Sequence, residues 1–269
     1  MAPRTLTSMP KRERIPVALT IAGSDSGGGA GIQADLKTFA ALGVHGTSAI
    51  TCLTAQNPRE VRAVQAASPA LVSAQIEAVF SELRPAAVKT GMLYSRSVIA
   101  AVVAAWPKRN PPPLVVDPVL IATSGARLLR PDAETSLIRD LIPLATVITP
   151  NLDEAAFLLG RPLRDLDDLR RAALDLHLRF GCAVLAKGGH LAKSKSASDV
   201  FFDGRTELVL SAPFVRGVST HGTGCTYSAA IAGYLALGLE LLAAVELAKQ
   251  HITQAIAQSV QIGKHTALN

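Results

Sequence analysis

The strongest constraint on this chain is a regular alternation of short apolar runs with longer segments of helical periodicity. The short runs have the length of strands, and several lack the two-residue alternation of a half-exposed strand, which is typical of strands covered on both faces. Repeated units of this kind predict an α/β fold in which helices cover both faces of a mostly parallel sheet, with ligands beyond the carboxyl ends of the strands. The predicted strands are 17–23, 47–57, 86–93, 113–120, 146–151 and 182–189, and the predicted helices are 31–43, 70–83, 95–106, 132–142 and 165–180.

The last predicted helix has a single apolar stripe that should lie against the sheet, because its apolar residues recur at steps of three and four. Residues 197–215 instead indicate an antiparallel hairpin at one edge of the sheet, and 191–196 before them resemble a mobile loop in composition. The stripe of the last helix consists of Leu241, Val245, Ala248, Ile252 and Ile256.

No internal repeat or linker divides the chain, so we expect one domain over residues 16–269 after a disordered basic lead-in at 1–15. A secretory signal is the lesser alternative for this region, because Pro16 and Thr20 interrupt the apolar run that follows the lead-in. The formal net charge is +6, of which residues 1–14 supply +3, and the later basic residues are scattered among acids. Together with an aromatic content of only 4%, this argues against a nucleic-acid partner.

The cysteines and the longest apolar stretch both favour a reducing cytoplasm and no membrane partner. Cys52, Cys182 and Cys225 are odd in number, far apart and without a C-x-x-C pair, which argues against a disulfide framework and a zinc site. The stretch from Thr226 to Ala248 contains two glycines and two glutamates, so two packed core helices explain it better than a membrane span.

A first candidate site is the glycine-rich turn in IAGSDSGGGAGIQADLK, residues 21–37, between a strand and a helix. It matches the dinucleotide-binding motif G-x-G-x-x-G/A poorly, because only GAGIQA fits that motif and no acid follows about 20 residues later. It also does not match a Walker A loop. The glycines indicate a sharp turn or the close approach of a ligand, and the pattern alone leaves both open. Asp35 either faces the same opening or is a solvated acid in the first helical turn.

A second candidate site is STHGTGCT, residues 219–226, where glycines precede a helix that we expect to begin near Cys225. The amides of Gly222, Thr223 and Gly224 would form an anion receptacle there, because first-turn amides have no partner within the helix and the helix dipole favours negative charge. A thiol at such a position is expected to have a lowered pKa and to be alkylated in preference to the other cysteines. The alternative is a small buried cysteine that packs a helix start.

A third group of polar residues follows three predicted strands, in VVDPV, TPNLDEA and AKGG. Asp117 and Glu154 are candidates for orienting Mg²⁺, directly or through water, and Lys187 for steadying a phosphate. Singly, each has another interpretation: Asp-Pro as a turn, Asn151 and Asp153 as helix caps, and Lys187 as a surface lysine. Their convergence on one edge of a parallel sheet favours a site.

These motifs, with TAQN, KTGML and KGGHL, occur in an order and spacing that resemble a known family. Over residues 16–262 the chain is similar to the hydroxymethylpyrimidine/phosphomethylpyrimidine kinases of thiamine biosynthesis, a branch of the ribokinase-like superfamily. The resemblance implies a three-layer α/β/α sandwich, a homodimer, and use of ATP and Mg²⁺. The implied reaction phosphorylates the hydroxymethyl group of 4-amino-5-hydroxymethyl-2-methylpyrimidine, and then the monophosphate to the pyrophosphate.

Two other functions stay open on the sequence alone. Pyridoxal or pyridoxine kinases phosphorylate a hydroxymethyl group on a similar six-membered ring, and some members of the superfamily accept both substrates. A non-catalytic ligand-binding relative is the alternative from another class, although the acids and the glycine-started helix argue against it.

The resemblance also implies roles for individual positions. In many ribokinase-like enzymes an aspartate ends the G-x-G-D motif and deprotonates the acceptor hydroxyl, whereas here, as in this family, that position is Cys225. Thr54 stands where valine is common in the family, which bears on the shape of the pocket. By resemblance, the pyrimidine is held by Gln56, Asp35, Gly23, Ala30, Thr54, Met92 and Val119, the phosphates by Lys187 and Asn151, and the metal by Asp117 and Glu154.

Overall fold

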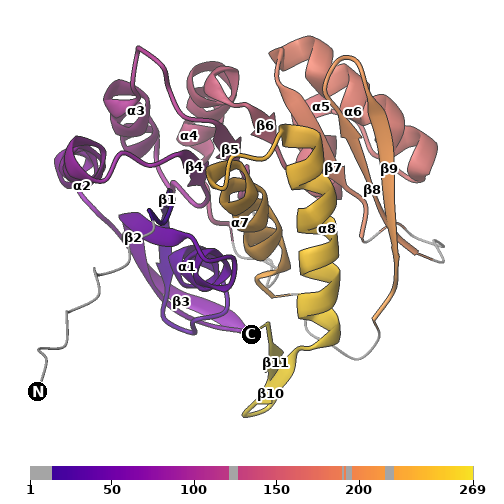
Figure 1. The fold of residues 1–269 in the computed structure, drawn as a ribbon, viewed down its shortest axis with the longest axis horizontal. Coiled ribbons are helices and arrows are strands. Elements are labelled where there is room, and N and C mark those ends of the chain that lie inside the picture. Colours follow the sequence, from indigo (N-terminus) through magenta and orange to yellow (C-terminus); the bar gives the residue numbers. More distant parts are fainter. Residues whose placement is uncertain (1–13, 121–126, 190, 192–195, 216–220, 269) are drawn as a thin grey trace, which may run out of the picture.

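The computed structural model describes residues 14–120, 127–189, 191, 196–215 and 221–268. Within them, strands β1 to β9 form one sheet in the order β3-β2-β1-β4-β5-β6-β7-β8-β9 (Figure 1). Residues 1–13 of the predicted lead-in and 192–195 of the predicted mobile loop lie outside the described residues. The strands are β1 Val17–Asp25, β2 His45–Asn57, β3 Glu60–Ala66, β4 Ala87–Thr90, β5 Leu114–Val116, β6 Val147–Ile148, β7 Ala183–Lys187, β8 Ser196–Phe202 and β9 Glu207–Pro213.

In the central part of the sheet, β2-β1-β4-β5-β6-β7, each adjacent pair of strands is parallel, as the β-α alternation predicts. The edge hairpin predicted at 197–215 is confirmed, since β8 and β9 are antiparallel. The opposite edge, β3, pairs antiparallel with β2 and was not predicted, because its mixed composition lacks a clear apolar alternation. The C-terminal pair β10 Val260–Ile262 and β11 His265–Ala267, a separate two-stranded sheet, was also not predicted.

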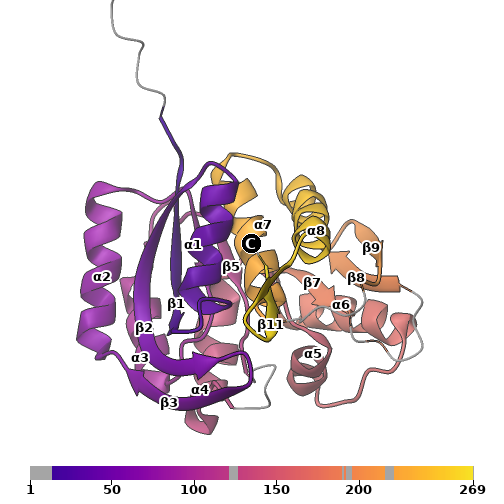
Figure 2. The same cartoon turned by 90° about the horizontal axis from the view of Figure 1, so that it is seen from below.

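Helices cover both faces of the sheet and give the predicted three-layer arrangement (Figures 1 and 2). The fourth helix is continued by a π-helical turn over Leu137–Leu141 and a 3₁₀ turn over Ile142–Leu144. One face carries α1 Gly31–Ala41, α7 Thr223–Ala236 and α8 Leu241–Ala257, and the other carries α2 Pro69–Glu82, α3 Arg96–Ala105, α4 Pro131–Ser136, α5 Leu152–Leu159 and α6 Leu166–Phe180.

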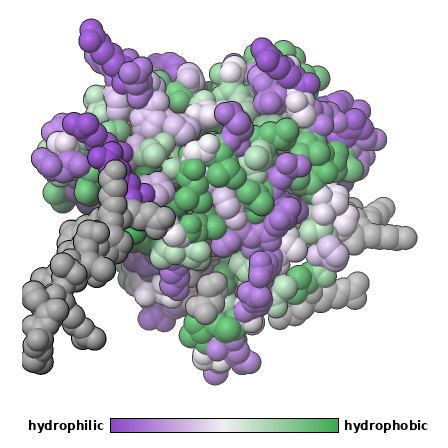
Figure 3. Space-filling view, viewed as in Figure 1, coloured by the Kyte–Doolittle hydropathy of each residue, from purple (hydrophilic) through white to green (hydrophobic). Residues whose placement is uncertain are grey.

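The segment that resembled a membrane span is two core helices, as predicted. Most of α7 is buried between the sheet and α8, and α8 buries its stripe through Val245, Ala248 and Ile252. Among the described residues, no helix combines the length and apolar character needed to cross a bilayer. On the face that carries α7 and α8, apolar and hydrophilic residues are interspersed (Figure 3).

The packing of α8 predicts a clear difference between two isoleucines. Ile252 is 4% exposed and Ile262, on β10, is 59% exposed. Truncating a buried isoleucine loses transfer free energy and leaves a cavity, so Ile252→Ala should lower the free energy of unfolding by about 2–5 kcal/mol. The matched control Ile262→Ala should change it by about 0.5 kcal/mol or less. Urea unfolding followed by circular dichroism measures both, and equal effects would contradict the packing described here.

Candidate active site

A cavity opens at the carboxyl ends of β1, β2 and β4, between these strands and the start of α7. The empty space between its lining residues, counted together with its open mouth, is about 380 Å³. The cavity brings together all but one of the residues predicted to hold the pyrimidine, together with the predicted catalytic cysteine. These lining residues are Gly23, Ala30, Thr54, Gln56, Met92, Val119 and Cys225.

Further lining residues were not selected from the sequence: Ser24, Asp25, Gly31 and Lys89, which lie in the quoted motifs, and Leu128, which lies outside them. Asp25 has the clearest function in the local structure, because the glycine-rich turn folds around its carboxylate. That carboxylate accepts hydrogen bonds from the amides of Gly27 at 2.8 Å, Gly29 at 3.1 Å and Ala30 at 2.9 Å. An aspartate two residues before a glycine in a turn was the signal for this role.

The charge on Asp25 is favoured by the same contacts. Its side chain is 3% exposed, and burial acts to raise its pKa. The hydrogen bond from His221 and the backbone amides outweigh this effect, and the pKa of Asp25 lies below its ordinary value. His221 Nε2 lies 3.1 Å from the carboxylate, so the acid contacts the segment that leads into α7.

Helix α7 begins two residues earlier than predicted. Its N-cap is Gly222, which has a φ of +82° and no side-chain cap, and Thr223 is the first helical residue. The amide of Thr226 donates to the carbonyl of Gly222 at 2.9 Å. The amides of Gly224 and Cys225 precede this bond, in positions that have no partner within a helix. A helix start therefore lies where the receptacle was predicted, and anion binding there stays a prediction.

The start of α7 faces the polar residues that follow β5 and β7. A Cβ atom on Gly224 would lie 3.3 Å from Lys187 Nζ and 3.9 Å from Asp117 Oδ2. Lys187 Nζ is 3.0 Å from Asp117 Oδ1, which also accepts from Thr149 at 3.0 Å, while Ser228 donates to Oδ2 at 3.1 Å. Burial acts to raise the pKa of Asp117, but Lys187 and Lys89 outweigh it and keep the pKa below its ordinary value.

Glu154 and Asn151 form a capping box at the start of α5, so the helix-cap interpretation of Asn151 is confirmed. Asn151 Oδ1 accepts from the Glu154 amide at 2.9 Å, and Glu154 Oε2 accepts from the Asn151 amide at 2.8 Å. Burial raises the pKa of Glu154 to about 7, with Lys187 lowering it and Asp117 raising it. The same group is thus a structural cap and a carboxyl that interacts electrostatically with Lys187 and Asp117.

Asp35 requires a correction, because it neither lines the cavity nor is solvated. It is 0% exposed, and both of its oxygens lie 2.9 Å from Lys89 Nζ, with Thr20 donating to one of them at 2.5 Å. Lys89 lines the cavity in its place. Burial acts to lower the pKa of Lys89, but the Asp35 carboxylate outweighs it and raises the pKa. The ammonium is therefore charged at neutral pH.

The predicted lowering of the Cys225 pKa is wrong. Burial raises the pKa of the Cys225 thiol to about 11, although Lys89 acts in the opposite direction. The desolvation of a thiolate outweighs the favourable end of the helix here, and Asp35 and Asp117 add to the rise. Burial also raises the pKa of Cys52 and of Cys182 to about 11, so the pKa does not distinguish Cys225 from the other two cysteines. Cys225 differs from them in exposure, since they are buried and it is half-buried.

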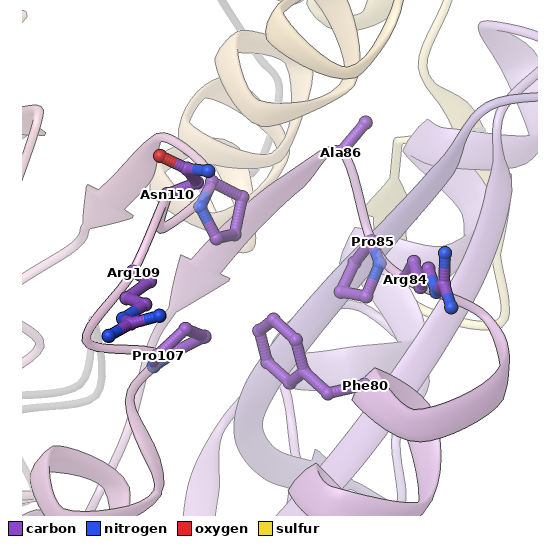
Figure 4. Close-up of a pocket in the computed structure, with 8 residues that line it drawn as sticks. Phe80, Arg84, Pro85, Ala86, Pro107, Arg109 and Asn110 are labelled. Carbon is purple, nitrogen blue, oxygen red and sulfur yellow. The ribbon is translucent and has the colours of Figure 1, made fainter.

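A second hollow lies at the opposite end of the sheet, before β4 and β5 (Figure 4). Phe80 of α2 faces Pro107 of the loop after α3 across it. None of the predicted site residues lines it, so the cavity at the carboxyl ends of the strands is the candidate active site.

The fold and this cavity define the class of the protein. A mostly parallel α/β sheet that places a small-molecule pocket beside a glycine-started helix and an Asp–Lys pair is the arrangement of a ribokinase-like small-molecule kinase. A comparison with family models then gives the particular group: residues 25–268 match the phosphomethylpyrimidine kinase model, and the chain belongs to that family.

Known relatives agree with this assignment. The hydroxymethylpyrimidine/phosphomethylpyrimidine kinase of Rhizobium meliloti (strain 1021) is 53% identical over 251 residues, which are 92% of this chain and 94% of the relative. The crystal structure of phosphomethylpyrimidine kinase from Clostridium difficile 630 is 47% identical with a TM-score of 0.79, and covers 90% of this chain and 100% of that one. An ADP complex of Bacillus subtilis pyridoxal kinase is 37% identical with a TM-score of 0.85, and covers 95% and 98%.

The raised pKa of Cys225 predicts a distinctive alkylation profile. Iodoacetamide reacts with the thiolate, and a thiol with a pKa of about 11 is almost fully protonated at pH 7. Its alkylation rate should therefore keep rising about tenfold per pH unit from pH 7 to 9.5, while that of glutathione begins to level off near its own pKa. Mass-spectrometric mapping of each cysteine measures this, and a Cys225 rate that levels off below pH 8 would contradict the raised pKa.

Proposed function

We propose that this chain transfers the γ-phosphoryl group of ATP to the hydroxymethyl group of 4-amino-5-hydroxymethyl-2-methylpyrimidine, and then phosphorylates the monophosphate to the pyrophosphate for thiamine biosynthesis. One observation carries the proposal: all of the predicted pyrimidine-binding residues except Asp35 line a single cavity, and Cys225 in the first turn of α7 lines it too. An acceptor in that cavity would have its hydroxyl group next to backbone amides suited to an anion.

In this proposal the cavity recognises the pyrimidine ring through a few polar groups on mostly apolar walls. Met92 and Val119 supply apolar surface, and Gln56 supplies an amide for the polar edge of the ring. The Thr54 hydroxyl donates to the Ser24 carbonyl at 2.9 Å and lies 3.3 Å from Gln56 Oε1. The hydroxyl that replaces the common valine thus lies beside the Gln56 amide, with its one hydrogen directed at the Ser24 carbonyl. Asp35 acts on the pocket through Lys89 and through its charge on Cys225.

The proposed roles at the reacting centre follow from charge. Phosphoryl transfer depends mainly on positioning and on stabilising the charge of the moving group, which we assign to Lys187 and to the amides from Gly222 to Cys225. Cys225 lies beside the acceptor and takes its proton when the thiolate is present. Because its pKa is about 11, this base step supplies less at neutral pH than the amides do.

The polar residues beside the start of α7 suit an Mg²⁺ ion that is bound together with the phosphates of ATP. In the part of the chain that the structure describes, no group of three or more His, Cys, Asp or Glu side chains is arranged to hold a metal. Asp117 and Glu154 are two carboxylates near Lys187, and Mg²⁺ commonly keeps several waters and binds one or two carboxylates together with substrate phosphates. We propose that these two acids hold the ion through water. When bound, the ion would neutralise part of the negative charge of the phosphates.

A pyridoxal kinase is the second candidate, favoured by the higher TM-score of the Bacillus subtilis relative, 0.85 against 0.79. The sequence identities, 37% against 47%, favour the pyrimidine kinase. Identity bears more directly on pocket residues, whereas TM-score reports the backbone, so the pyrimidine is the proposed substrate. The predicted homodimer and cytoplasmic location stay predictions.

The test of function is product analysis by mass after incubation of the purified chain with ATP, Mg²⁺ and the pyrimidine. We expect the monophosphate first and the pyrophosphate later, with kcat/KM at least about tenfold higher for the pyrimidine than for pyridoxal, a difference of about 1.4 kcal/mol. Product from pyridoxal alone would support the second candidate. No product from either would support a non-catalytic relative.

The anion-binding role of α7 predicts a large kinetic effect at Gly224. A side chain there would approach Lys187 and occupy the space over the first-turn amides. Since one preorganised donor contributes about 2.7–4 kcal/mol, Gly224→Val should lower kcat by about 10²–10³-fold. Thermal unfolding serves as the control for folding. A variant with normal kcat would contradict the role of these amides.

The base role of Cys225 predicts a smaller effect and a change in the pH profile. Cys225→Ser should lower kcat by about 10²-fold and leave the KM for ATP within about threefold, because a serine hydroxyl is a weaker base at the same place. A raised pKa means that the thiolate increases with pH, so wild-type kcat should rise between pH 7 and 9. The serine variant should lose this rise. An unimpaired serine variant would remove the base role.

A further inference from the structure

The site is built from two segments that are far apart in the sequence and in direct contact in the fold: the turn between β1 and α1, and the residues that start α7. The positive φ of Gly222 places this residue against the carbonyl oxygen of Gly29, where a Cβ atom would collide with that oxygen. The amide of Gly31 hydrogen-bonds the thiol of Cys225. A Cβ atom on Gly29 would lie 2.8 Å from Cδ2 of the His221 ring. The two segments therefore leave no room for a side chain on Gly29 or on Gly222.

One carboxylate is shared by both segments. Oδ2 of Asp25 accepts the amides of Gly29 and Ala30 within the turn and lies 3.1 Å from Nε2 of His221, the residue before the N-cap of α7. Both side chains are shielded, with exposures of 3% for Asp25 and 12% for His221. A hydrogen bond to a charged and largely desolvated carboxylate is stronger than a neutral one, so this contact is directional as well as close.

We propose that Asp25 and His221 form a positioning pair that fixes the acceptor pocket relative to the amides at the start of α7. The inference rests on the proposed function of this site. Ala30 of the pocket belongs to the turn and Gly31 begins α1, while the amides of Gly224 and Cys225 belong to α7. Phosphoryl transfer needs both within a fraction of an ångström of their productive places, and a displacement of about 1 Å can cost about 10²-fold in rate.

Removing this pair should affect the reaction more than the stability of the fold. Helices α1 and α7 also pack directly against each other farther along, where a Cβ atom on Gly233 would lie 2.6 Å from Leu42 Cδ1. Apolar contacts of this kind keep the two helices together when a single hydrogen bond is removed. Loss of the Asp25–His221 contact should therefore loosen the start of α7 against the turn and leave the global stability nearly unchanged.

The test compares His221→Leu, His221→Gln, Asp25→Asn and the double variant His221→Leu/Asp25→Asn in the full chain. With the pyrimidine, ATP and Mg²⁺, His221→Leu should lower kcat at least about tenfold, with the KM for ATP within about threefold and the midpoint of thermal unfolding within about 3 °C. His221→Gln keeps a side-chain N–H donor for Asp25 and should retain kcat within about threefold. The double variant should have about the same kcat as Asp25→Asn. Removing either partner already breaks the contact, so removing the second partner should cost no further activity.

Two matched controls lie away from the site. His177 on α6 has a half-buried ring whose Nδ1 lies 2.8 Å from the Cys182 carbonyl, and Asp203 accepts two amides in the turn between β8 and β9. His177→Leu and Asp203→Asn remove a similar histidine contact and a similar turn acid, and should leave kcat unchanged.

Several results would overturn the proposal. They are wild-type kcat in His221→Leu, equal losses in the leucine and glutamine variants, or losses in the double variant that simply multiply. If Asp25→Asn does not fold, the comparison of leucine with glutamine at position 221 still decides. A wild-type chain without any phosphorylated product would overturn the proposed function and the role of the pair with it, whereas an active wild type beside an equally active His221→Leu would overturn the pair alone.

Discussion

The contact of Gly222 with the carbonyl oxygen of Gly29 is the constraint on which the rest of the site depends. It needs a residue without a side chain and with a positive φ, and it starts α7 directly against the glycine-rich turn. From this start, Gly224 lies close to Lys187 and Asp117, while Cys225 lines the cavity. A helix begun elsewhere would separate the cavity from the backbone amides that we propose receive the moving anion.

Charge is arranged around this start in two buried pairs. Lys89 is held by Asp35 at the cavity, and Lys187 is held by Asp117 beside the start of α7. Each ammonium is paired and remains charged, so the site has positive groups on two sides without an uncompensated buried charge. The same burial keeps the Cys225 thiol protonated at neutral pH. The chemistry is therefore weighted toward fixed donors and cations rather than toward a reactive thiolate.

Much of this could be predicted from the sequence, because the signals were local or periodic. The β-α alternation predicts the parallel sheet, and the ordered motifs predict which residues meet in the cavity. What could not be predicted depends on packing in three dimensions. Nothing near Asp35 in sequence reveals that Lys89 lies above it, and the helix-terminus argument for Cys225 omits desolvation, which only the folded surroundings determine. The sequence indicates that Asp25 accepts hydrogen bonds in a turn, but its contact with His221 joins residues 196 positions apart.

The central claim is that the amides at the start of α7 receive the phosphoryl group in transfer. A crystal structure with ADP, Mg²⁺, aluminium fluoride and the pyrimidine tests it most directly, since the fluoride marks the place of the moving group. The account predicts that the fluoride lies at hydrogen-bond distance, about 2.7–3.2 Å, from the amides of Gly224 and Cys225 and near Lys187. A fluoride bound elsewhere, with these amides facing solvent or protein, would contradict it.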